Sequence, residues 1–415
     1  MLRSKIIKLI RSEIIDCLNF DYFVKISLCN GCGVDSVPCV SENQNVTQGQ
    51  IIAKNSKDEN LSVYVHSSIN GKIKGVQVSK LMLSNMINNI QIEPVKVNDF
   101  KKLNQKKINE VTIQSLKSRL LECGIIDSEN AGHPIYDEIE NFSLNCQILI
   151  LNACIVDKIF CAECSVLYHY TDEIISGINI LKKVCCFKKI YIVANALLKS
   201  VFSDIEPKLC KNGIQIVYVK NNCRKINDDL ISKNCKKFDE IKIGENRNYA
   251  VLKVQTVKEI YNAVEFGLPV TGKIISVCGN CLKGNYNVCV PIGVNILDVV
   301  KNVKMEICSV EDFEEKQKKV IEDFQNWQRK KFSYKENCDK QEFYEKQKVV
   351  NSEIFEFLKY EKKYKRFLRK TLIFCENDKV LKSDNFNFNV QKTTNGFEFS
   401  NRSFNFKKEN KIKIK

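Results

Sequence analysis

Cysteine supplies the most distinctive chemistry in this sequence, because twenty cysteines occur in 415 residues beside only three histidines. Thiols two residues apart can hold one tetrahedral metal ion, or they can close a reducible disulfide. Cysteine also packs as a small buried hydrophobe, and close pairs arise by chance at this frequency. The sequence leaves redox, metal and packing roles open for its three C-x-x-C pairs: Cys29/Cys32, Cys161/Cys164 and Cys278/Cys281.

The pair Cys161/Cys164 has the best position for chemistry. It follows the apolar run 149–151, which is typical of a buried strand, and precedes a segment whose apolar residues have helical spacing from Ile174 to Leu181. Ligands of α/β sheets lie at the carboxyl ends of strands, where this pair falls. We therefore predict redox thiols at Cys161 and Cys164. The other paired thiols are candidate ligands of zinc or an iron–sulfur cluster: Cys29, Cys32, Cys278 and Cys281.

Composition and charge narrow the functional classes. The 65 Lys and Arg exceed the 49 Asp and Glu, giving a net charge of +16, but these residues are spread along the chain. A nucleic-acid-binding protein would gather them into a basic stripe, so no nucleic acid is expected as a partner. Three histidines argue against a His-rich metal site or a Ser-His-Asp hydrolase. No apolar run has the length of a membrane span or a signal peptide, which predicts a cytoplasmic protein with reduced thiols.

The first hundred residues divide into a helix and an all-β module. Ile6, Ile10 and Ile14 share one helical face within residues 1–20, and we expect this amphipathic helix to dock on the first domain, with a membrane-surface helix as the alternative. Residues 46–53 read V-T-Q-G-Q-I-I-A, which resembles the turn and strand of lipoyl-like β-sandwiches. No lysine-bearing tip for a lipoyl or biotinyl arm follows this motif.

Several further motifs occur in one collinear order. They are similar to those of RnfC-type electron-transfer subunits and of the related flavoprotein subunit of respiratory complex I, and the proline-reductase-associated branch (PrdC) is a plausible closer relative. The first matches the family's flavin loop, G-I-V-G-x-G-G-A-G-F-P-T, and the second its L-I-I-N-G-A-E-C-E-P run. The matching segments are 124–135, 149–178, 248–263, 267–279, 285–293 and 392–395.

The resemblance implies an α/β multidomain fold. A lipoyl-like β-sandwich precedes a Rossmann-like flavoprotein-type domain, a β-grasp domain of the soluble-ligand-binding (SLBB) type, and a helical C-terminal insertion. The expected divisions are the helix 1–20, the RnfC-type barrel-sandwich domain 21–100, the α/β domain 101–245, the SLBB domain 246–304, the charged helical insertion 305–371, and a β remnant with a basic tail, 372–415.

Departures from the family pattern weaken the implied cofactors. Asp127, Glu129 and Asn130 replace three glycines of the flavin loop, so side chains and charge stand where the backbone would approach a phosphate. FMN and NADH binding are therefore in doubt. The residues that would form this degenerate pocket are Ala131, Gly132, Pro134, Asn152, Asp157 and Glu163. After Cys289 only isolated cysteines occur, which excludes the family's pair of ferredoxin-type 4Fe–4S clusters.

Two functions remain open at this stage. The first is an RnfC/PrdC-like electron-transfer subunit that passes reducing equivalents to a partner reductase or membrane redox complex, through thiols or a residual flavin site. The second is a non-catalytic scaffold or binding module of the same fold. The first hypothesis places the chain in the cytoplasm, peripheral to the inner face of the cell membrane.

Overall fold

The computed structural model describes residues 2–18, 21–29, 35–54, 62–80, 86–95, 110–127, 129, 132–155, 160–220, 226–278, 282, 284–295, 298–300, 303, 374–376, 379–381, 388–393 and 396–401. The chain splits into one unit of residues 1–278 and 284–305 and a second of residues 279–283 and 306–415. The predicted helical insertion 305–371 and the basic tail lie outside the described residues.

The second unit is described only by two antiparallel hairpins. β17 (Phe374–Glu376) pairs with β18 (Lys379–Leu381), and β19 (Phe388–Thr393) pairs with β20 (Gly396–Asn401). These strands lie in the region 372–415, where the sequence predicts β structure.

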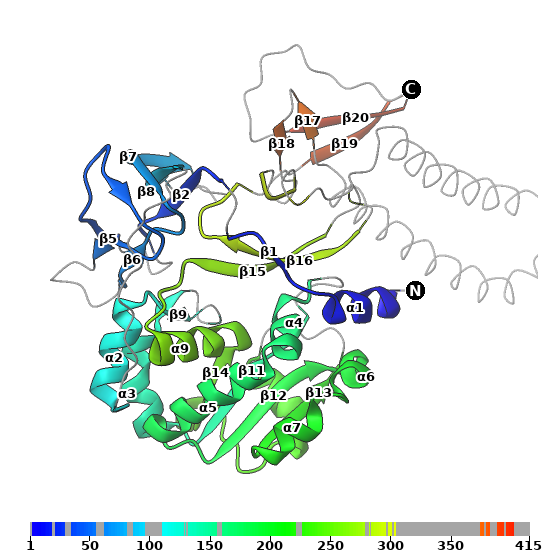
Figure 1. Ribbon diagram of the computed structural model, residues 1–415. Helices are drawn as coiled ribbons and strands as arrows, with labels where there is room; N and C mark the ends of the chain where they lie inside the picture. The colour runs from blue at the N-terminus through cyan, green and yellow to red at the C-terminus, as the bar shows by residue number, and fades with distance from the viewer. Residues whose placement is uncertain are drawn as a thin grey trace, which may run out of the picture. The chain divides into compact units, whose positions relative to one another are not determined.

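A four-stranded parallel sheet forms the centre of the first unit (Figure 1). Its strands, in the order β13-β12-β11-β14, are Ile214–Val219, Lys189–Asn195, Ile148–Asn152 and Tyr249–Lys253. Every residue of β11 is buried, as the apolar run predicts. Leu149 and Leu151 belong to one apolar cluster and Ile148 and Ile150 to another, because successive side chains of a strand face opposite sides of the sheet.

Helices cover this sheet. α5 (Thr171–Cys185) buries Ile174, Ile178 and Leu181, so the predicted apolar stripe is the face that packs inward. The remaining helices of this region are α2 (Ile113–Glu122), α3 (Ile135–Asn145), α4 (Ala162–His169), α6 (Lys199–Phe202), α7 (Glu206–Lys211), α8 (Asp228–Lys233) and α9 (Val254–Phe266), with short 3-10 turns at Ala196–Leu198, Cys235–Lys237 and Gly244–Asn246.

Gly177 allows α5 and α9 to approach closely. A Cβ atom at this position would lie 2.5 Å from the Val257 carbonyl oxygen and 2.8 Å from Val257 Cγ1. No side chain fits into that space, so the contact between the two helices depends on glycine.

The N-terminal module is a sandwich of two antiparallel sheets, as predicted. One sheet has the order β2-β8-β7-β4 and the other β3-β5-β6. The strands are β2 (Val24–Ser27), β3 (Val37–Pro38), β4 (Asn45–Val46), β5 (Ile51–Lys54), β6 (Val65–His66), β7 (Gly71–Lys80) and β8 (Met86–Pro94). Gly49 has a φ of 82° in the V-T-Q-G-Q turn, a conformation that favours glycine. His66 is buried in β6, and burial lowers its pKa to about 4.

The N-terminal helix differs from the expectation. α1 (Leu2–Arg11) packs against α4 and α6 rather than on the β-sandwich, and its Ile6, Leu9 and Ile10 join the apolar cluster of the α/β core. His169 Nε2 lies 2.9 Å from both the Ile10 and the Ser12 carbonyl oxygens, where α1 ends. The helix is therefore part of the central core.

A three-stranded sheet follows the α/β region in the chain. Its order is β1-β16-β15, with β1 (Ile15–Asp16) parallel and β15 (Gly272–Val277) antiparallel to β16 (Tyr286–Pro291). A small hairpin pairs β9 (Ile126–Asp127) with β10 (His133–Pro134). Because β14 pairs with β11, the division expected at residue 246 falls before a strand of the α/β sheet. No helix among the described residues is long and apolar enough to cross a membrane.

Candidate functional site

The strand order creates a crevice at one place in the parallel sheet. The chain runs from β11 outward to β12 and β13, and then returns to place β14 on the other side of β11. Ligands of open α/β sheets bind at such a switch point, outside the carboxyl ends of the two central strands. Here that place lies beyond Asn152 at the end of β11 and Lys253 at the end of β14.

Asn152 is bonded to a carboxylate from the loop between β9 and β10. Its Nδ2 donates to both carboxylate oxygens of Glu129, at 3.0 and 2.9 Å, and its Oδ1 accepts from the Cys154 N–H at 3.0 Å. The Glu129 N–H in turn donates to Asp127 Oδ1 at 2.8 Å. The structure thus brings together the predicted flavin loop and the predicted strand end, and Glu129 occupies the donors of Asn152.

Glu163 uses the N-terminus of α9. Its Oε2 accepts the N–H of Gln255 at 2.9 Å, one of the helix donors that have no partner within the helix. Burial raises the pKa of the Glu163 carboxyl, while the Gln255 N–H and the charges of Lys253 and Lys273 oppose that shift. The carboxylate takes the position at which a helix N-terminus would otherwise receive an anion.

Cys161 and Cys164 lie at the start of α4, next to the same crevice. Cys161 is the N-cap residue and its N–H donates to Ser276 Oγ at 3.1 Å, whereas Cys164 Sγ donates to the Ala153 carbonyl at 3.1 Å. Their exposed fractions are 1% and 0%. Burial raises the pKa of Cys161 to about 11 and that of Cys164 well above its usual value, so both are protonated at neutral pH.

A buried amide organises the polar groups around Cys161. Asn287 on β16 donates from Nδ2 to Ser165 Oγ at 2.6 Å and to the Leu9 carbonyl at 3.1 Å, and its Oδ1 accepts from Ser276 Oγ at 2.7 Å. Cys278, two residues beyond Ser276, lies near Cys161; its pKa rises to about 12, mainly through burial and then through that thiol.

FMN does not fit the described part of this crevice. A flavin phosphate needs free N–H donors and a neutral or positive surrounding. The amide of Asn152 is used by Glu129 and the N–H of Gln255 by Glu163, and both carboxylates would repel a dianion. We therefore route no chemistry through a flavin at these residues.

Comparisons with known proteins place the chain. The family model of the RnfC barrel-sandwich hybrid domain matches residues 9–97, which include the two sheets of the N-terminal module. The chain belongs to an RnfC-like family. The central parallel sheet and its helices, together with this domain, give the mixed α/β architecture that the sequence predicts.

Two curated relatives align with the chain, and both are RnfC-type components of larger complexes. The one from the proton-translocating ferredoxin:NAD(+) oxidoreductase complex of Clostridium ljungdahlii is 20% identical over 70% of this chain. The one from the ion-translocating oxidoreductase complex of Pectobacterium atrosepticum is 20% identical over 66%. The RnfC-like chain spans 62% of the first relative and 40% of the second. The crystal structure of an air-oxidized NAD+-reducing NiFe hydrogenase aligns at 11% identity over 46% of this chain and 38% of that one, with a TM-score of 0.34, which is too low to carry an argument.

The remaining predicted site residues divide into two groups. Gly132, with a φ of 85°, and Pro134, the N-cap of α3, shape the loop beside the crevice. Ala131, Asp157, Cys32 and Cys281 lie outside the described residues, so the zinc or iron–sulfur sites predicted at Cys29/Cys32 and Cys278/Cys281 stay predictions. Where the structure is described, no group of three or more His, Cys, Asp or Glu side chains could hold a metal ion.

Sequence reasoning missed several partners in this site. Gln255, Ser276 and Asn287 contact the predicted residues, yet each is separated from them by a long stretch of chain. Glu129 carried the one usable signal, because a carboxylate stands there in place of a family glycine. The sequence interpretation treated that carboxylate as an obstacle to phosphate and did not anticipate its bond to Asn152.

Proposed function

We propose that this RnfC-like chain belongs to an electron-transfer complex, peripheral to the inner face of the cell membrane, and that it serves there as a docking and scaffold subunit. Membership of such a complex is supported by the two relatives, each named as a component of an oxidoreductase complex that translocates protons or ions. A partner redox protein or reductase would supply the cofactors. A closer relation to the PrdC branch remains part of this proposal.

The observation that carries the scaffold role is the mutual saturation of the crevice. Asn152 is bonded to Glu129, and the first free donor of α9 is bonded to Glu163. A site that satisfies its own donors with its own carboxylates gains nothing from binding a phosphate and loses solvation by admitting one.

Electron transfer through Cys161 and Cys164 is a second candidate. Both thiols lie in the first turn of α4, and a helix N-terminus stabilises a thiolate. Burial opposes this effect and keeps both thiols protonated. A relay of this kind would cycle between a dithiol and a disulfide, giving two electrons and two protons to an oxidised partner.

The test uses the full chain purified without oxygen. We expect less than about 0.1 FMN per chain and no visible absorbance from iron–sulfur, while the tagged chain isolated from its own cells brings down a complex that carries these chromophores. FMN added to the free chain should bind at least roughly tenfold more tightly to the double variant Glu129→Gln with Glu163→Gln, since each change removes one repelling charge.

The control is Glu140→Gln, which removes an exposed carboxylate on α3 that pairs with Lys117, away from the crevice. This variant should bind FMN as the unaltered chain does. Stoichiometric FMN in the purified chain would contradict the scaffold role, and a complex free of redox chromophores would contradict the electron-transfer setting.

A further inference from the structure

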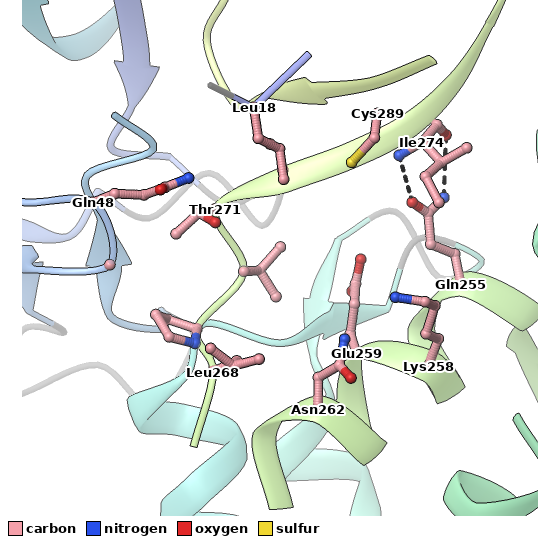
Figure 2. Close-up of a pocket in the computed structure, with 14 residues that line it drawn as sticks. Leu18, Gln48, Gln255, Lys258, Glu259, Asn262, Leu268, Thr271, Ile274 and Cys289 are labelled. Atoms are coloured by element: carbon pink, nitrogen blue, oxygen red, sulfur yellow. Dashed lines mark hydrogen bonds between the residues drawn. The ribbon is translucent and has the colours of Figure 1, made fainter. Parts of the chain in front are cut away.

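A cavity of about 340 Å³ lies between α9 and the β15–β16 pair, apart from the crevice of the parallel sheet (Figure 2). Volumes of this size suit small-molecule ligands, which bind in largely apolar hollows with a few placed polar groups. Its lining comprises Leu18, Gln48, Gly49, Gln255, Lys258, Glu259, Asn262, Leu268, Pro269, Val270, Thr271, Gly272, Ile274 and Cys289.

Glu259 is the group in this cavity that needs a partner. The residue is 9% exposed, and Figure 2 shows its side chain rising from α9 into the space below the strands. Its Oε1 forms an ion pair with Lys273, whereas its buried Oε2 has no hydrogen-bond partner among the described residues. A buried carboxylate oxygen without a donor is costly, so such an atom marks a place for a missing donor.

Three further polar side chains line the cavity without a hydrogen bond in the described structure: Gln48, Asn262 and Thr271. By contrast, the Gln255 amide is fully used, because Oε1 accepts the Ile274 N–H at 2.7 Å and Nε2 donates to the Ile274 carbonyl at 3.3 Å. The free side chains come from separate elements and can complete the polar contacts of a bound molecule.

The charges around the cavity balance within the protein. Glu259 is paired with Lys273, and Lys258 Nζ lies 3.2 Å from Glu173 Oε2 and 4.3 Å from the centre of the Tyr170 ring. The lining thus offers no spare charge for an ion to neutralise. An uncharged ligand loses the least solvation on entering such a site.

We propose that this cavity binds a small uncharged molecule with an apolar body and a primary amide, whose N–H donates to Oε2 of Glu259. Leu18, Val270 and Ile274 provide apolar surface for the body of the ligand. The amide oxygen accepts from the side chains of Asn262 or Gln48. This inference rests on Glu259 and its cavity and is independent of the role proposed above.

The probe is benzamide, compared with benzoate, in calorimetric titrations of the full chain. Benzoate has the same ring and nearly the same shape, but it carries a charge and has no N–H. We expect benzamide to bind at millimolar concentration and at least roughly tenfold more tightly than benzoate, because a hydrogen bond to a charged acceptor is worth that factor or more. Glu259→Gln, which turns one acceptor into a donor, should remove the preference.

A blocking variant places the binding in this cavity. Asn262→Trp fills the space from α9 and should weaken benzamide binding at least roughly tenfold. Leu144→Trp, at a helical position on α3 that is 79% exposed, should leave it unchanged. Equal binding of benzamide and benzoate, no binding of benzamide, or full binding by a folded Asn262→Trp would overturn the proposal. If Asn262→Trp does not fold, the comparison of the two probes decides.

Discussion

At the scale of single residues, the position of a thiol and its environment pull in opposite directions. Cys161 caps α4, and a helix N-terminus favours the thiolate. The side chain is 1% exposed, however, and loss of solvation penalises the charged form more than the helix end stabilises it, so its pKa is about 11. The same spacing that suggests a redox pair in the sequence is therefore held in its least reactive form.

This balance gives a labelling prediction. In the native chain at pH 7.5, iodoacetamide should modify the exposed Cys39, Cys186 and Cys210 within minutes and leave Cys161 and Cys164 intact. The rate depends on the accessible thiolate, which burial removes twice over, through exclusion of the reagent and through the raised pKa. Peptide mass spectrometry at timed intervals measures each site. Labelling of Cys161 at the rate of Cys210 would contradict the scaffold role and favour the thiol relay.

At the scale of elements, the packing of two helices depends on one missing side chain. α5 and α9 meet at Gly177, where the carbonyl of Val257 occupies the place of a Cβ. Glycine usually weakens a helix by about 1 kcal/mol relative to alanine. Here it is needed because close approach, and not helix propensity, sets the stability of the contact.

Gly177→Ala should accordingly destabilise the chain although it improves the helix. Overpacking costs about 1–3 kcal/mol, which exceeds the gain of about 1 kcal/mol in propensity, so we expect a net loss of roughly 1–2 kcal/mol. Urea unfolding followed by circular dichroism measures the change. Asn179→Ala, at an exposed position of the same helix, should be neutral or stabilising. An unchanged or raised midpoint for Gly177→Ala would show that the helices adjust without cost.

At the scale of the first unit, one amide joins three parts of the chain. Asn287 on β16 is 1% exposed and bonds the end of α1 through Leu9, α4 through Ser165, and β15 through Ser276. α1 is thereby attached both by its apolar face and by this network, which explains why it lies on the α/β core.

Asn287→Ala should loosen this junction. It leaves buried polar partners on three elements without a bond, at a cost of about 2–3 kcal/mol, and should increase hydrogen exchange of α1. The control is Asn145→Ala, whose amide bonds only the exposed Asn141 and should change stability by less than about 0.5 kcal/mol. Equal effects of the two variants on the urea midpoint and on exchange in α1 would refute the role given to Asn287.

The sequence by itself determined the features that depend on neighbouring residues. The run 149–151 became a wholly buried strand, the spacing from Ile174 to Leu181 became the inner face of α5, and V-T-Q-G-Q became a turn with glycine at positive φ. Periodicity and turn chemistry are local, so they can be recognised without a fold. The order of the motifs also indicated the family.

Only the tertiary structure decided the state of the candidate site. Glu163 accepts from Gln255 across 92 positions, and Asn287 reaches Ser165 across 122. The solvation of Cys161, the saturation of Asn152 and the cavity at Glu259 all depend on such distant partners. Burial and hydrogen bonding are properties of the assembled chain, because desolvation of a side chain is set by the residues that surround it in space.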